Sequence, residues 1–106
     1  MPSIHFGLER YQLAPCSVVL SLSEFDFDRF PQWGEVLLAQ LPATLIEAQL
    51  DGDLHSWLID FEDCRLLLKA EHYSEAVWLE PIDPVQSQAV MDYLAQLFER
   101  GFHLVV

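Results

Sequence analysis

The chain has 106 residues, and its 17 acidic side chains outnumber its five lysines and arginines, which gives a formal net charge of -12. Because 52% of the residues are hydrophobic, intrinsic disorder is excluded. The length suits one domain, residues 1–106, built around a single core. The shortage of basic side chains argues against nucleic-acid binding, since affinity for phosphates comes largely from lysine and arginine.

The N-terminus, Met1 to Phe6, lacks a basic segment followed by an apolar stretch, so no signal peptide is expected. Apolar runs such as residues 66–68 are far shorter than the roughly 20 residues needed to cross a bilayer. We therefore expect a cytoplasmic protein without a membrane partner. Cys16 and Cys64 each lie in an apolar, strand-like run, which favours two buried free thiols over a disulfide.

The first part of the chain predicts a hairpin and a helix. Residues 4–13 and 17–23 alternate between apolar and polar side chains, as paired strands do. Residues 24–28 alternate acids with phenylalanines; they are expected to cap the next helix, and the alternative is a motif that docks on a basic groove. Pro31 suits the first turn of that helix, whose apolar positions recur from Trp33 until Pro42.

Residues 43–82 predict four strands, at 44–50, 54–61, 64–70 and 76–82. The segments 51–53 and 62–63 are expected to form tight turns, because aspartate and glycine tolerate the backbone angles of such turns. Short turns make neighbouring strands antiparallel.

A final helix is the clearest element. Asp83 is expected as its N-cap and Pro84 as its first residue, and Gly101 closes it. The apolar tail at 102–106 is expected to pair as a short edge strand or to fill a gap as a plug. The order ββαββββα predicts an α+β fold: an antiparallel sheet of about five to six strands with two helices packed on one face.

Alternation within the four strands separates two sets of side chains. The set expected to face the helices is apolar: Trp57, Ile59, Phe61, Leu66, Leu68, Val77 and Leu79. The opposite set mixes charges with large apolar side chains: Leu58, Asp60, Arg65, Leu67, Lys69, Glu71, Trp78 and Glu80. Either the N-terminal strands or the tail covers this second face, or it binds a partner. The residues expected to bind a partner are Leu58, Arg65, Leu67, Lys69 and Trp78.

The sequence offers few candidate residues for metal binding or catalysis. Asp51, Asp53 and His55 are candidate metal ligands, because residues two apart in an extended segment point the same way. A hairpin turn explains the two aspartates equally, and the loop 72–75 could line a pocket or simply connect two strands. The sequence contains no nucleophile elbow and no glycine-rich phosphate loop, so no catalytic residue and no cofactor are expected.

The segments 54–62, 66–69 and 73–80, with their aromatic strand positions, resemble a small family of bacterial proteins of about this length. That family, found mostly in gammaproteobacteria, is a domain of unknown function. The resemblance implies an uncharacterised bacterial protein and transfers no catalytic residue.

These observations favour a non-enzymatic interaction module, an adaptor or a chaperone-like protein, that binds another protein or forms a homodimer through an exposed sheet face or edge. A protein that binds a small ligand or a metal is one alternative. An acidic mimic of nucleic acid is the other, since its charge would attract nucleic-acid-binding proteins.

Overall fold

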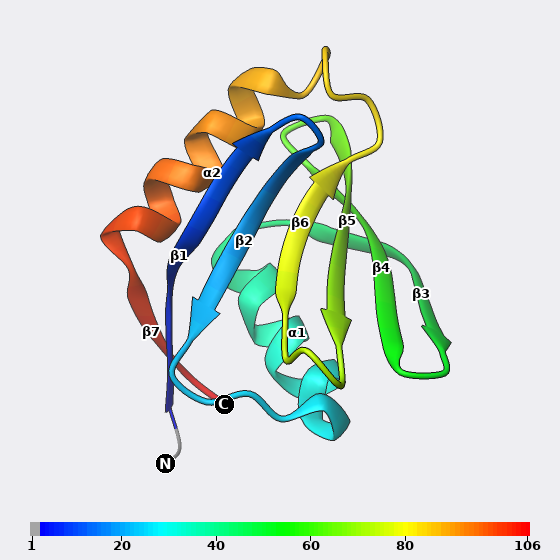
Figure 1. The fold of residues 1–106 in the computed structure, drawn as a ribbon, viewed down its shortest axis with the longest axis vertical. Helices are drawn as coiled ribbons and strands as arrows, with labels where there is room; N and C mark the ends of the chain where they lie inside the picture. Colours follow the sequence, from blue (N-terminus) through cyan, green and yellow to red (C-terminus); the bar gives the residue numbers. More distant parts are fainter. Residues whose placement is uncertain (1–2) are drawn as a thin grey trace.

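A computed structural model describes residues 3–106. It confirms the α+β class: one antiparallel sheet and two α-helices on the same face of it (Figure 1). The strands are β1 (Ser3–Leu13), β2 (Cys16–Leu22), β3 (Thr44–Asp51), β4 (Leu54–Phe61), β5 (Cys64–Glu71), β6 (Val77–Pro81) and β7 (Phe102–Val105). The helices are α1 (Phe30–Gln40) and α2 (Gln88–Arg100), and a short 3-10 helix, η1 (Phe27–Arg29), precedes α1.

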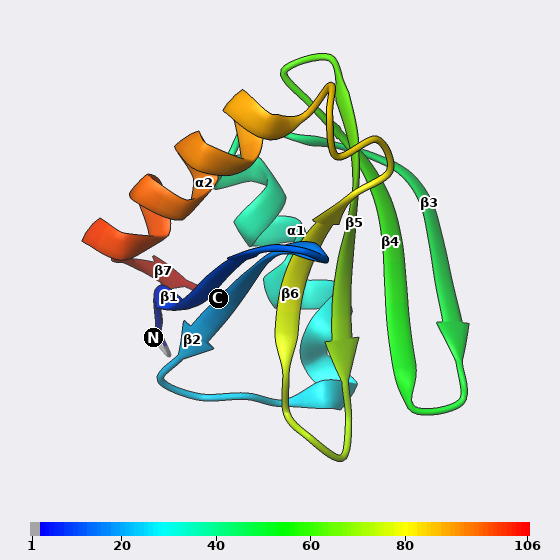
Figure 2. The same ribbon diagram turned by 45° about the horizontal axis from the view of Figure 1, so that its top comes forward.

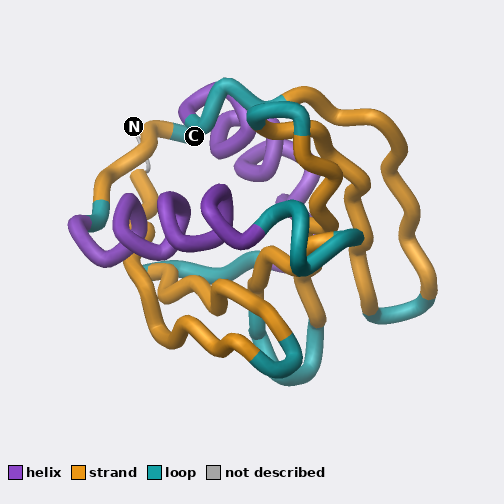
Figure 3. The backbone as a smooth tube through the Cα atoms, turned by 90° about the horizontal axis from the view of Figure 1, so that it is seen from above, coloured by secondary structure: helices purple, strands orange, loops and turns teal. Residues whose placement is uncertain are grey.

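The sheet order is β3-β4-β5-β6-β2-β1-β7, so two strands distant in sequence, β2 and β6, pair at its middle. Each of these central strands leads into a helix. The helix α1 connects β2 to β3 at one edge, and α2 connects β6 to β7 at the other. The sheet curves so that both helices lie on its concave side (Figures 2 and 3).

The core lies between the concave face and the two helices. All seven side chains predicted to face the helices are buried. Gly34 in α1 lets the helix approach the sheet, because a Cβ atom there would lie 3.0 Å from the ring of Trp57. Cys16 and Cys64 are buried free thiols, as expected.

The predicted strand count is wrong, because the sheet has seven strands and the order ends in a further strand. The apolar tail forms β7 and pairs with β1 from Ser3↔Val105 to Phe6↔Phe102. Leu104 is buried there and Phe102 stacks on Phe6, so burial of apolar side chains explains the added strand.

The predicted start of the last helix is also wrong, since α2 begins at Gln88 rather than Pro84. The carboxylate of Asp83 still acts as a cap, but of a turn: it accepts hydrogen bonds from the backbone N–H groups of Val85 and Gln86. The backbone N–H of Ser87 donates to the carbonyl of Asp83, which closes this turn, and the helix starts at the next residue.

Asp26, Glu62 and Asp63 take the local roles expected of acidic residues. The carboxylate of Asp26 accepts a hydrogen bond from the backbone N–H of Asp28 and so caps η1. Glu62 and Asp63 both have positive φ, the backbone conformation of a tight hairpin turn between β4 and β5.

Candidate docking surface on the outer sheet face

The outer face of the sheet, turned away from the helices, carries the five residues predicted to bind a partner. Cross-strand pairing aligns Leu58 with Leu67, and Lys69 with Trp78, so each pair projects from the same face. Arg65 lies opposite Asp60 on the same side. Four of the five are half-buried and Arg65 is exposed.

No described element covers this face. The N-terminal hairpin, which was one possible cover, extends the sheet sideways through the pairing of β2 with β6. The tail, the other possible cover, lies at the edge as β7. Figure 1 looks onto the outer face, and no helix or strand of residues 3–106 lies in front of β5, β6 and β2.

Ion pairs organise the charges on the outer face. Glu80 accepts a hydrogen bond from the indole Nε1 of Trp78 at 2.9 Å and forms a salt bridge with Nζ of Lys69 at 3.0 Å. A second salt bridge joins Arg65 to Asp60 at 3.6 Å. Glu80 thus contacts both Trp78 on its own strand and Lys69 on the neighbouring strand.

A third basic residue that the sequence did not single out lies on the same face. Val19 pairs with Arg10 on one side and with Trp78 on the other, so Arg10 projects from the outer face as well. These side chains line a surface hollow of about 400 Å³ together with Glu71 and Glu80. Three of the five lysines and arginines of the chain therefore lie on this face.

The candidate metal ligands do not converge. Asp51 pairs with Leu54 on the outer side of the β3–β4 hairpin, whereas His55 pairs with Leu50 on the concave side. Gly52 has positive φ and occupies the turn between the two strands, as expected if the aspartates belong to a hairpin turn rather than to a metal site. Within residues 3–106, no three histidine, cysteine, aspartate or glutamate side chains lie close enough together to hold a metal ion.

His55 is part of the aromatic core. Its ring is buried and stacks on Phe30 with 4.7 Å between ring centroids, and its Nε2 donates to the carbonyl oxygen of Phe27 at 3.2 Å. The ring of Phe27 also contacts His72, whose centroid lies 5.0 Å away. Phe27 therefore contacts both histidine rings, and His55 has a packing role that explains its position.

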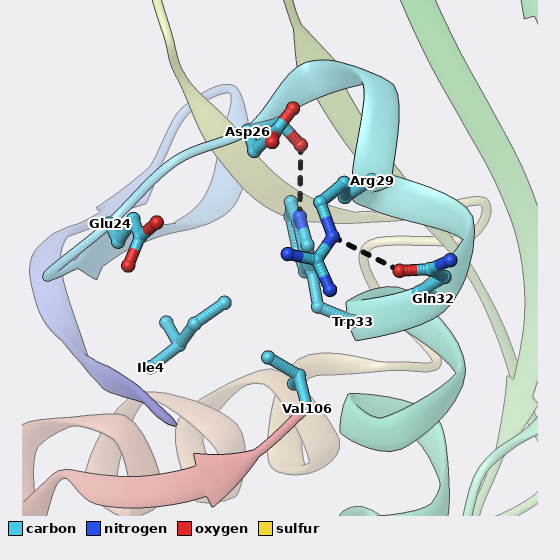
Figure 4. A pocket seen from close by; sticks show the side chains of 7 residues that line it. All are labelled: Ile4, Glu24, Asp26, Arg29, Gln32, Trp33 and Val106. Atoms are coloured by element: carbon cyan, nitrogen blue, oxygen red, sulfur yellow. Dashed lines mark hydrogen bonds between the residues drawn. The ribbon is translucent and has the colours of Figure 1, made fainter. Parts of the chain in front are cut away.

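A small cavity lies between the start of β1, the segment from Glu24 to the first turn of α1, and Val106 (Figure 4). Its apolar lining residues are Ile4, Trp33 and Val106, and its polar ones are Glu24, Asp26, Arg29 and Gln32. Its internal volume is about 20 Å³. Since one water needs some 10–15 Å³ measured in this way, the cavity cannot enclose a metabolite.

A polar cluster that sequence reasoning missed joins β1 to α2. The hydroxyl of Tyr11 donates to the carboxylate of Asp92 at 2.5 Å, and the amide of Gln88 donates to both groups. Burial, followed by the hydrogen bond to Asp92, raises the pKa of Tyr11 to about 12. Burial and the Asp92 charge also raise the pKa of the nearby Cys16 thiol. Tyr11 and Asp92 are 81 positions apart, so no local sequence pattern reveals the contact.

The strand pairing and side-chain contacts define the outer face, and comparison with known proteins shows the family to which the chain belongs. A family model described as "Protein of unknown function (DUF3630)" matches residues 6–99. The chain belongs to the DUF3630 family. No curated protein and no solved structure matches the chain. The family description names no activity, so the candidate site of this DUF3630 protein rests on the arrangement of its side chains.

Neither helix of the described residues is both long enough and apolar enough to cross a membrane.

Proposed function

We propose that the protein is a non-enzymatic interaction module whose outer sheet face docks on the same face of a second copy. The observation that carries the proposal is the uncovered face with Leu58, Leu67 and Trp78 at its middle and ion pairs around them. A central aromatic anchor within a polar rim is the usual arrangement of a protein interface.

The charge distribution favours a second copy as the occupant. The surface outside the outer face has only Arg29 and Arg100 as basic residues, so most other contacts between two copies bring acid against acid. On the outer face, Arg65 and Asp60, like Lys69 and Glu80, offer both signs side by side. A two-fold axis through this face can therefore match opposite charges reciprocally.

The extent of the sheet sets an upper limit on the area that the outer face can bury in a dimer. Seven strands spaced about 4.8 Å apart, with roughly seven residues each, give a plan area on the order of 700 Å². Each partner of a standard interface buries about 800 Å². Because this face is the convex one and the estimate counts all seven strands, two copies in contact around Leu67 and Trp78 bury less than this area, which corresponds to a weak, concentration-dependent dimer.

Sedimentation velocity over a range of protein concentrations tests the proposal. We expect the unmodified protein to be in a monomer–dimer equilibrium. Trp78→Ala and Leu67→Glu should each weaken the dimer by more than about ten-fold, because they remove or charge the centre of the interface. The matched control is Tyr93→Ala, which removes a half-exposed aromatic ring from α2, outside the outer face.

Thermal unfolding of each variant shows whether it is folded. Arg65→Glu is a further variant of the outer face, chosen because the Arg65 side chain is 57% exposed and therefore not needed for the core. A strictly monomeric protein at every concentration overturns the proposal. Equal weakening by Tyr93→Ala also overturns it, because the dimer would then not depend on the outer face.

A further inference from the structure

The two edges of the sheet differ in a way that points to a second binding site. The edge strand β7 has four residues, whereas β3 has eight, and every one of those eight is exposed. β3 pairs with β4 on one side, and no described strand lies on its other side (Figure 2). Alternate backbone N–H and C=O groups along that side therefore lack a strand partner.

β3 lacks the length limit, the lysine and the proline that protect many natural edge strands from further pairing. Such strands are commonly short, or they carry charged side chains, lysine above all, or proline, or a bulge twists them away. β3 is long and contains neither lysine nor proline; its charges are the acidic Glu47 and Asp51, and its one irregularity lies between Leu45 and Glu47. The stretch from Glu47 to Asp51 keeps a regular register with β4. It is thus a ready template for one more strand.

The side chains of β3 form two rows of different chemistry. Pairing with β4 places Leu45, Ala48 and Leu50 on the concave side, opposite Ile59, Trp57 and His55. Leu45 is 37% exposed and Leu50 61% exposed, so this apolar row is incompletely covered. The same pairing places Thr44, Glu47, Gln49 and Asp51 in the outer row.

Charge decides which strand fits. Neither β3 nor β4 contains a lysine or arginine, and Glu47 and Asp51 make the outer row acidic. A second copy of β3 would bring another acidic row alongside the first, and like charges on neighbouring strands are destabilising. A strand with basic side chains in the outer row would instead pair favourably with Glu47 and Asp51.

We propose that β3 binds an extended segment of another protein in which apolar residues alternate with lysine or arginine. The segment adds an eighth strand to the sheet through backbone hydrogen bonds, as in other cases of β-strand addition. Its apolar side chains lie over the concave row, and its basic side chains lie beside the acidic row. This site uses the edge of the sheet and is independent of dimerisation through the outer face.

A peptide titration followed by amide NMR tests the proposal. The probe is an end-capped peptide as long as β3 in which valine and lysine alternate. We expect the amide resonances of residues 44–51 to shift most on titration. A peptide with glutamate in place of lysine should bind at least about ten-fold more weakly.

Two forms of the probe distinguish strand addition from attraction by net charge. Each form is N-methylated on one of the two alternating sets of backbone amides. Only one set faces β3 in an added strand, so one form should lose binding and the other should keep it. Equal binding by the two forms, or shifts confined to residues outside 44–51, overturns the proposal.

Charge reversal on the protein supplies the matched comparison. The double variant Glu47→Lys with Asp51→Lys should prefer the glutamate peptide. The control, Glu75→Lys with Glu99→Lys, changes the net charge equally at exposed positions outside the sheet and should keep the preference for lysine. Loss of that preference in the control overturns the proposal.

Discussion

The two faces of β5 lie in opposite environments within one strand. On the concave side, Leu66 and Leu68 are completely buried under the helices. On the outer side, Leu67 lies half-buried between Arg65 and Lys69, whose charges pair with neighbouring strands. Packing demands explain every side chain of the concave row. They do not explain the apolar side chain of Leu67 in the outer row, and this difference is the reason to propose that the outer face binds a partner.

The largest expected effect separates the two faces directly. Leu68→Ala should lower the free energy of unfolding by about 3 kcal/mol, because it leaves a cavity in a fully packed core. Leu67→Ala, the same change one residue away, should cost about 1 kcal/mol or less, since its site is partly open to water. Urea unfolding of both variants measures the difference. Equal costs would show that the outer face is as tightly packed as the core.

A polar contact on the concave side should make stability depend on alkaline pH. The pKa of Tyr11 is raised from 10.0 to about 12, so the unfolded chain loses this proton before the folded protein does. The contribution of Tyr11 to the free energy of unfolding should therefore be fully present below pH 10 and be lost as the pH rises from 10 to 12. Tyr11→Phe removes the ionisable group, and its unfolding free energy should fall less steeply over this range. Parallel curves for the two proteins would contradict the assigned role of Tyr11.

The smallest expected effects come from the two ion pairs of the outer face. Lys69→Met should cost on the order of 0.5–1 kcal/mol, since this pair is half-buried and is shorter than the other. Arg65→Met should cost less than about 0.5 kcal/mol, because its pair is more exposed and longer. Chemical unfolding at low and high salt measures both. A larger loss of unfolding free energy for Arg65→Met than for Lys69→Met would mean that solvent exposure does not determine which of the two salt bridges is the more stabilising.

Local patterns were sufficient to predict much of the fold and the face that carries the candidate site. Alternation in β4, β5 and β6 predicted which side chains face the helices, because period two leaves no other arrangement for adjacent antiparallel strands. The same alternation places Asp60, Arg65, Lys69 and Glu80 on one face, where the structure has the salt bridges Arg65–Asp60 and Lys69–Glu80.

Long-range contacts could not be predicted in this way. The pairing of β2 with β6 joins Val19 to Trp78 and so brings Arg10 to the outer face, but nothing in either strand specifies its partner. The start of α2 was misplaced because Asp83 and Pro84 suit a tight turn as well as a helix start. The exposed edge at β3 depends on the sheet order, which sequence alone left open.

Fluorescence quenching of Trp78 tests the central claim most directly. Trp33 and Trp57 are buried in the concave core, so Trp78 is the tryptophan that a soluble quencher such as acrylamide can reach. If two copies dock through the outer face, the quenchable fraction of the fluorescence should fall as the protein concentration rises. The variant Trp78→Phe should show no such change. A quenchable fraction that stays constant across the range in which the protein dimerises would contradict docking through this face.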